Sequence, residues 1–292
     1  MTAGENALFR PLRIGSLTIA GRVVKSATSE TRATTDGFAT QALIDFYAPI
    51  AQGGTPLIIT GNIYVSLDGK STPMQMGIDD DGKIPALAKL VDAVHAHGVA
   101  IFAQLSHSGR QVLPGFAGLM EAVSASAVKD LSTGTRPRAL TKAEIDRVVE
   151  RFGEAADRCR RAGFDGIEIH AGHGYLISQF LTPHTNRRND DHGGSVQNRV
   201  RLLSEIHRAM RARVGTDYPI IMKLNGDDYL PLRAGLKTAE LVEIARIMEQ
   251  EGIDGVEISV GHYESGFPVV RGTFGRALRA MVQGSGRHLP AV

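Results

Sequence analysis

Cysteine is almost absent from this chain: among 292 residues there is one, Cys159. A single cysteine excludes a disulfide within the chain and any iron–sulfur cluster that several cysteine thiolates would hold. It also favours a reducing compartment. No apolar run approaches the ~20 residues that a membrane-spanning helix needs. Residues 1–10 lack the basic-then-apolar pattern of a secretory signal, so we expect a soluble cytoplasmic protein.

An excess of charge is missing as well. Lys and Arg number 33 against 31 Asp and Glu, a formal net charge of +2. That balance argues against nucleic acid or a membrane surface as a partner. The hydrophobic share of 42%, with 33 Gly and 12 Pro, is ordinary for a globular protein, and the length suits one large α/β domain or two smaller ones.

What is present is an alternation of short apolar runs with longer amphipathic stretches. The runs are mostly continuous, as expected for parallel strands covered on both faces. The amphipathic stretch at 142–162 starts with a capping-box spacing from Thr141 to Glu144, which marks a helix start. The strand candidates are 22–28, 56–62, 99–105, 166–170, 219–224 and 255–259, and the helix candidates are 41–52, 84–97, 142–162, 196–214 and 239–251.

One phrase occurs twice. AGFDGIEI at 162–169 returns as EGIDGVEI at 251–258, and in both a glycine ends a helix before a short strand. A repeated αβ unit favours a TIM (β/α)8-type barrel over a doubly wound sheet. Ahead of the first strand, LRIGSLTI within 8–21 predicts a hairpin that closes the bottom of the barrel.

The predicted barrel is short of strands. Six are used by residue 259, and the 33 residues that remain are too few for two βα units of ~30 residues each. We therefore expect a single domain over 1–292 with about six βα units, without the last two, and an irregular tail at 261–292.

Active sites of such barrels lie where the strands end. Two imidazoles and a phenol follow one strand here, in His170-Ala-Gly-His173-Gly-Tyr175. Both histidines can donate a hydrogen bond to one substrate oxygen, and a tyrosine with an ordinary pKa of about 10 can act as general acid. The same rule selects Ser26, Ala27, Thr28, Gly61, Gln104, His107 and Lys223.

Two other readings of the histidine pair stay open. The imidazoles can simply cap a loop, or they can bind zinc with His107 or Glu168 as a further ligand, as in a metal-dependent barrel hydrolase. Because Glu168 alternates with Ile169, we expect it to face a helix, which weakens the zinc reading.

Gln104 and Lys223 interrupt apolar strands. A buried amide or ammonium costs several kcal/mol unless a polar partner satisfies it. An amide can pair with the edge of a heterocycle, and a lysine can stabilise an anionic ring; the alternative for Lys223 is a core ion pair with Glu168 or Glu257. The chain has no GxGxxG, GxxxxGK or GxSxG motif, so a nicotinamide cofactor would not be held by a Rossmann domain.

These pieces resemble the old yellow enzymes, the FMN-dependent NAD(P)H:flavin oxidoreductases on TIM barrels. The resemblance runs from residue 8 to about residue 266. It rests on LFRPLRIGSLTIAGRVVKSATSE (8–30), DFYAPIAQGGTPLIITGNIYV (45–65), QLSHSGR (104–110), EIHAGHGYLISQFLTPHTNRRNDDHGGSVQNRVRLL (168–203) and GVEIS (255–259).

By this resemblance, the strand-end residues fall into two sets. His170 and His173 match the pair that holds the substrate's carbonyl or nitro oxygen, and Tyr175 matches the proton donor. The other set supports the flavin: Gln104 at its pyrimidine edge, Lys223 near N1 and the C2 oxygen, Gly61 beside the ring, and Ser26, Ala27 and Thr28 along the first strand.

The implied function is FMN-dependent reduction of activated C=C bonds, with NAD(P)H as electron donor and a small α,β-unsaturated carbonyl or nitro compound as substrate. The family's last two strands, which bind the FMN phosphate, have no counterpart before Val292. We therefore expect weak FMN binding, and unpaired edges at the first and sixth strands that are compatible with a homo-oligomer. A non-catalytic fragment or remnant of such an enzyme stays the alternative.

Overall fold

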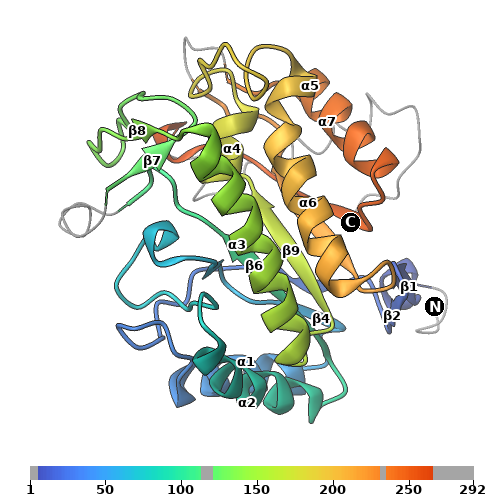
Figure 1. Cartoon of the computed structure of the whole chain (residues 1–292). Helices are drawn as coiled ribbons and strands as arrows, with labels where there is room; N and C mark the ends of the chain where they lie inside the picture. Colours follow the sequence, from blue (N-terminus) through green and yellow to red (C-terminus); the bar gives the residue numbers. More distant parts are fainter. Residues whose placement is uncertain (1–5, 113–120, 231–234, 266–292) are drawn as a thin grey trace.

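A curved parallel β-sheet forms the centre of the computed structural model, which describes residues 6–112, 121–230 and 235–265 (Figure 1). Its main strands are neighbours in chain order, and all of their pairings are parallel. Each overlaps a stretch that the sequence predicts as a strand. They are β3 (Val24–Lys25), β4 (Leu57–Ile59), β6 (Ala100–Ser106), β9 (Gly166–Ala171), β10 (Ile220–Asn225) and β11 (Gly255–Ser259).

The sheet curls until its first and sixth strands face each other across the interior. Ser26, next to β3, donates a 2.5 Å hydrogen bond to Glu257 Oε1 on β11, although 231 positions separate them. Within the described residues, β3 pairs only with β4 and β11 only with β10. Parallel order, curvature and outer helices together make this a TIM-type α/β barrel architecture, as predicted. Of the predicted tail, residues 266–292 lie outside the described residues.

The helices cover the outer face of the sheet. Helices α3 (Lys142–Arg161) and α6 (Arg201–Val214) lie side by side over β6 and β9 (Figure 1). Thr141 and Glu144 form the predicted capping box at the start of α3. Among the described residues, no helix is both long and apolar enough to cross a membrane. The remaining helices are α1 (Gln41–Gln52), α2 (Ile84–His95), α4 (Leu176–Leu181), α5 (Val196–Arg199) and α7 (Thr238–Gln250).

Two helices differ from the prediction. The stretch 196–214 divides at Val200 into α5 and α6. Helix α4 was not predicted, and all six of its residues are buried. A short helix that is buried on every side shows no polar face in the sequence, so periodicity could not reveal it.

The N-terminal hairpin lies against the amino ends of the strands. Strands β1 (Leu12–Ile14) and β2 (Leu17–Ile19) pair antiparallel around Gly15, whose φ of 56° lies in the region that glycine adopts without strain. Ile14 and Ile19 form a separate apolar cluster beneath the sheet, with Leu57, Ile59, Phe102 and Ile221.

Short elements complete the described part of the chain. Strand β5 (Ile63–Tyr64) pairs with β6, and β7 (Val123–Ser124) pairs with β8 (Arg138–Ala139). The 3-10 turns are η2 (Ala7–Phe9), η3 (Leu67–Gly69), η4 (Asp81–Lys83) and η5 (Tyr263–Ser265).

Candidate active site

Neighbouring strands place charged and polar side chains in one register inside the barrel. Lys223 on β10 is opposite His170 on β9 and Glu257 on β11. Its ammonium nitrogen lies 3.0 Å from Glu257 Oε1 and donates a 3.0 Å hydrogen bond to Ser26 Oγ. Lys223 is almost fully buried, so the core ion pair considered as an alternative for this residue is present.

Glu168 faces the barrel interior, and the prediction that it faces a helix is wrong. It stands opposite Gln104 and accepts a 2.5 Å hydrogen bond from Gln104 Nε2, with Lys223 Nζ 3.7 Å away. Its neighbours Ile167 and Ile169 pack in the main core instead. On a strand buried on both faces, alternation does not tell which face lies inside.

The pKa values of the two interior carboxyls, Glu168 and Glu257, are shifted in opposite directions. Burial raises the pKa of Glu168 well above its ordinary value. Burial also opposes ionisation of Glu257, but its hydrogen bond with Glu168 and the nearby Lys223 outweigh that effect and lower its pKa. Glu168 is therefore the more readily protonated of the two carboxyls, and Glu257 is the one that pairs closely with Lys223.

The loop after β9 brings His170, His173 and Tyr175 against one another. The two imidazole ring centroids lie 5.1 Å apart, and the His170 ring lies 4.6 Å from the Tyr175 ring. His173 has a positive φ of 59°, and its backbone amide donates a 2.9 Å hydrogen bond to Asn225 Oδ1 at the end of β10. The loop is thereby attached to the neighbouring strand, and the three predicted side chains form one cluster.

Both histidines are neutral near pH 7. Burial, with help from His173 and Lys223, holds the pKa of His170 well below its ordinary value. Burial and Lys223 likewise lower the pKa of His173 to about 4. The Gly172 amide donates to His170 Nδ1 at 3.3 Å, which leaves the His170 proton on Nε2. Burial raises the pKa of Tyr175 well above its ordinary value, so its phenol stays protonated.

The three residues that follow the first strand, Ser26, Ala27 and Thr28, differ in their contacts with this site. Ser26 contacts Lys223 and Glu257 directly. Thr28 Oγ1 donates a 3.2 Å hydrogen bond to the Ser26 carbonyl. Ala27 packs against the apolar cluster of the hairpin, so its side chain is not part of the polar network.

Gly61 follows β4 and is closely surrounded. Its amide donates a 2.6 Å hydrogen bond to Glu30 Oε1, and a Cβ atom at this position would lie 2.2 Å from Glu30 Oε2 and 2.4 Å from the Thr28 carbonyl oxygen. Only glycine therefore fits here without movement of its neighbours. Glu30 supplies the acceptor of this hydrogen bond, and the sequence analysis did not select Glu30 as a site residue.

Two further residues near the cluster were missed. Ser259 Oγ lies 2.6 Å from His173 Nε2, and the Tyr263 hydroxyl lies 3.3 Å from that of Tyr175. Ser259 ends β11 and Tyr263 follows it, so the strand-end rule applied to the last strand would have found both residues.

Metal binding finds no support in the described residues. Within 6–112, 121–230 and 235–265, no group of three or more His, Cys, Asp or Glu side chains is arranged to hold a metal ion. His107, considered as a zinc ligand, accepts a 3.0 Å hydrogen bond from the Gly109 amide through Nδ1, and its Nε2 lies 3.7 Å from Asp68.

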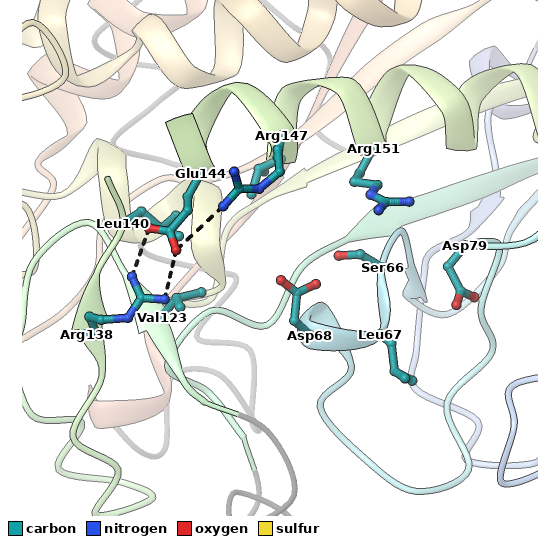
Figure 2. Close-up of a pocket in the computed structure, with 11 residues that line it drawn as sticks. Ser66, Leu67, Asp68, Asp79, Val123, Arg138, Leu140, Glu144, Arg147 and Arg151 are labelled. Carbon is teal, nitrogen blue, oxygen red and sulfur yellow. Dashed lines mark hydrogen bonds and ion pairs between the residues drawn. The ribbon is translucent and has the colours of Figure 1, made fainter. Parts of the chain in front are cut away.

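A cavity of about 470 Å³ lies outside the barrel, between the first turns of α3 and the turn η3 (Figure 2). None of the predicted site residues lines it. Part of its charge is paired within the cavity: Arg138 forms a 2.8 Å ion pair with Glu144, and Arg147 lies 3.8 Å from the same carboxylate. The interior cluster at the strand ends, and not this cavity, is therefore the candidate active site.

Comparison with known proteins identifies the family of this chain. A family profile described as "NADH:flavin oxidoreductase / NADH oxidase family" matches residues 7–280. The NADH oxidase of Thermoanaerobacter brockii is 41% identical over 259 residues, which are 88% of this chain and 40% of that protein. The NADPH dehydrogenase of Listeria welshimeri is 38% identical over 259 residues, 87% of this chain and 73% of that protein.

Solved structures of related oxidoreductases have the same fold as this chain. An old yellow enzyme homologue from Zymomonas mobilis superimposes with a TM-score of 0.78 at 31% identity, over 87% of this chain and 74% of that one. A 2-naphthoyl-CoA reductase complex gives a TM-score of 0.83 at 32% identity, over 89% of this chain and 41% of that one.

The chain spans only part of the first relatives: 40% of the NADH oxidase and 39% of a metal reductase from Desulforamulus reducens. The profile nevertheless covers most of the chain, and the family uses FMN together with NADH or NADPH. This chain belongs to the NADH:flavin oxidoreductase / NADH oxidase family.

Proposed function

We propose that this protein is an FMN-dependent oxidoreductase that uses NAD(P)H to reduce C=C bonds activated by a carbonyl or nitro group. The observation that carries the proposal is the cluster of the His170 and His173 imidazoles and the Tyr175 phenol beside the buried pair Gln104 and Lys223. The substrate would be a small electron-poor alkene.

The residues present fit a flavin. Gln104 and Lys223 are both about 2% exposed at the inner face of the sheet, where Gln104 donates to Glu168 and Lys223 pairs with Glu257. The amide of Gln104 would meet the pyrimidine edge and Lys223 the region of N1 and the C2 oxygen. Ser26, Thr28 and Gly61, with the backbone at Ala27, would line the side of the first strands. When bound, FMN supplies hydride transfer between NAD(P)H and the substrate.

The histidines would bind the activating oxygen of the substrate. His170 presents its Nε2 proton, and a neutral donor costs less to bury than a charged one. The Nε2 of His173 is occupied by Ser259 at 2.6 Å, so a substrate oxygen would take the place of the Ser259 hydroxyl. Two such donors stabilise the negative charge that develops on the oxygen during reduction.

Tyr175 would deliver the proton that completes the reduction. Its ring lies 4.6 Å from that of His170, next to the oxygen-binding pair. Its raised pKa keeps the hydroxyl protonated until the α-carbon of the substrate becomes basic enough to accept the proton.

The test is anaerobic turnover of 2-cyclohexenone with NADH or NADPH by the FMN-loaded protein, with cyclohexanone as the product to be quantified. Cyclohexanone itself is the matched control, because it has the carbonyl without the conjugated C=C bond. Cyclohexanone formation in proportion to NAD(P)H consumed would support the proposal. Oxidation of NAD(P)H that requires oxygen, with no saturated ketone formed anaerobically, would contradict it.

A further inference from the structure

We infer that Tyr263 is the outer half of a proton path that returns a proton from solvent to Tyr175 after each reduction. The inference rests on the proposed function for its catalytic meaning, but the path itself is a property of the two hydroxyls. Their oxygens lie 3.3 Å apart, and their rings meet edge to face with centroids 5.9 Å apart. Catalytic hydrogen bonds are often this long before substrate binds and shorten in the complex.

The two tyrosines differ in their access to water. Tyr175 is 8% exposed, whereas Tyr263 is 44% exposed. A proton donor buried to this extent needs a relay, because water does not reach its oxygen freely. Tyr263 spans that route, because its hydroxyl contacts that of Tyr175 and the residue reaches the surface.

The other polar neighbours of Tyr175 do not lead to solvent. Asn62 and Ser71 both influence its pKa, and both are buried. An amide does not exchange protons readily, and the Ser71 hydroxyl donates inward to Gln75 Oε1 at 3.0 Å. Among the described neighbours of Tyr175, Tyr263 is therefore the hydroxyl that connects it with the surface.

The residues on both sides of Tyr263 are held by buried contacts. Glu264 Oε2 forms a 3.1 Å ion pair with Arg110 and a 2.5 Å hydrogen bond with His184, and Glu264 Oε1 accepts a 2.6 Å hydrogen bond from the Leu131 amide. Burial opposes ionisation of Glu264, but these contacts outweigh it and hold its pKa at about 2.

On the other side, His262 is fully buried, and its backbone forms an isolated parallel β-bridge with the backbone of His173. These contacts fix the backbone on both sides of Tyr263. The phenol itself is placed by its hydrogen bond and edge-to-face contact with Tyr175.

The proton balance of the path is simple. The O–H bond of Tyr175 breaks as its proton goes to the substrate α-carbon, which leaves a phenolate. The hydroxyl of Tyr263 gives its proton to that phenolate, and a solvent water restores Tyr263. No electrons move along the path, and one proton enters from solvent for each alkene reduced.

The test measures the hydroxyl proton directly. In protein carrying tyrosine labelled with 13C at Cζ, the exchange rate of the Tyr175 hydroxyl with solvent is read by NMR from the deuterium isotope shift. Tyr263→Phe keeps the ring and removes the hydroxyl, and we expect it to slow Tyr175 exchange by about tenfold or more. Tyr229→Phe is the matched control, because Tyr229 is 39% exposed and lies on another loop; it should leave the rate unchanged. An unchanged rate in Tyr263→Phe overturns the inference.

A kinetic arm separates the relay from a packing role. A single turnover starts from protonated Tyr175, so Tyr263→Phe should leave it nearly as fast as wild type while slowing repeated turnover. Equal slowing of both, with normal hydroxyl exchange, would show a packing role and overturn the relay. If wild type reduces no enone but exchange still slows in Tyr263→Phe, the path stands and the proposed function fails.

Discussion

His170 and His173 act, in our proposal, as neutral donors that are already in place before substrate arrives. Their low pKa values follow from burial, and burial also removes the water that would compete for the substrate oxygen. Losing one preorganised donor of this kind typically costs ~10²–10³ in rate.

We therefore expect His170→Ala to lower enone reduction by ~10²–10³ and to weaken the binding of phenols such as p-hydroxybenzaldehyde. Phenol affinity is measured by optical titration of the FMN-loaded protein. His97→Ala, at an exposed position after α2, should change neither quantity. Phenol binding as tight as that of wild type in His170→Ala would rule out the oxygen-binding role.

Tyr175→Phe tests the proton donor separately from hydride delivery. The phenol is needed only when the substrate is protonated, so enone turnover should slow by ~10²–10⁴ while reduction of the flavin by NAD(P)H stays nearly unchanged. Stopped-flow traces of the two half-reactions make this comparison. Equal slowing in both halves would indicate that the ring of Tyr175 serves packing alone.

At the scale of elements, the loop from β9 to α4 decides the geometry of the site. Gly174 lies between His173 and Tyr175 with a φ of 85°, and a Cβ atom there would lie 2.5 Å from His262 Nε2 and 2.7 Å from Gln111 Nε2. The loop thus packs directly on His262, the residue that precedes Tyr263. Position 174 is restricted twice, by its backbone angle and by its neighbours.

We expect Gly174→Ala to lower the free energy of unfolding by more than the cost of its left-handed backbone conformation. A left-handed conformation costs an alanine about 1–2 kcal/mol. Gly252→Ala is the matched control, because Gly252 has a φ of 84° and nothing within 4 Å of a Cβ atom. Gly252→Ala should lose about 1–2 kcal/mol of unfolding free energy in urea. Gly174→Ala should lose more than that, because its Cβ atom would also meet His262 and Gln111. Only Gly174→Ala should also lose activity, by about tenfold or more, since a ~1 Å displacement at a site can cost 10²-fold. Full activity in Gly174→Ala would show that the loop adapts.

The elements also show where sequence reasoning succeeded. Helix α1 has the predicted bounds, and the capping box of α3 is present, because amphipathic period and capping are local properties. Helix α4 was missed because its burial on every side depends on contacts with distant segments.

At the scale of the whole molecule, the buried histidines make stability depend on pH. His173 has a pKa of about 4 in the folded protein against an ordinary value of 6.5, and His170 is shifted in the same direction. Between these values the unfolded chain binds more protons than the folded one, so the contribution is complete above pH 6.5 and is lost as the pH falls toward 4. For His173 alone the loss is up to about 3 kcal/mol.

Urea unfolding at pH 7 and pH 4.5 measures this dependence. Relative to pH 7, we expect the midpoint at pH 4.5 to be lower in wild type than in His173→Asn, which cannot titrate. The raised pKa of Glu168 acts in the opposite direction over this pH range, but it does so in both proteins and cancels in the comparison. Glu264 does not confuse the comparison, because its shift from 4.5 to about 2 acts mainly at lower pH. The same pH difference in wild type and His173→Asn would show that His173 is not buried as a neutral group.

The sequence by itself determined the barrel class, the six strands, the five long helical stretches and the candidates at the strand ends. These follow from hydrophobic period, capping, repeats and the position of polar residues after apolar runs, all of which are local. It also carried the resemblance to the old yellow enzymes, which the family comparison confirmed.

Only the tertiary structure decided which side chains meet. Glu168 turned out to face Gln104 and Lys223 because strands covered on both faces give no sign of which face is inside. The contact of Tyr263 with Tyr175 joins residues 88 positions apart. Such contacts arise when parallel strands bring their carboxyl ends to one edge, and no local pattern in the chain records which partners that edge will unite.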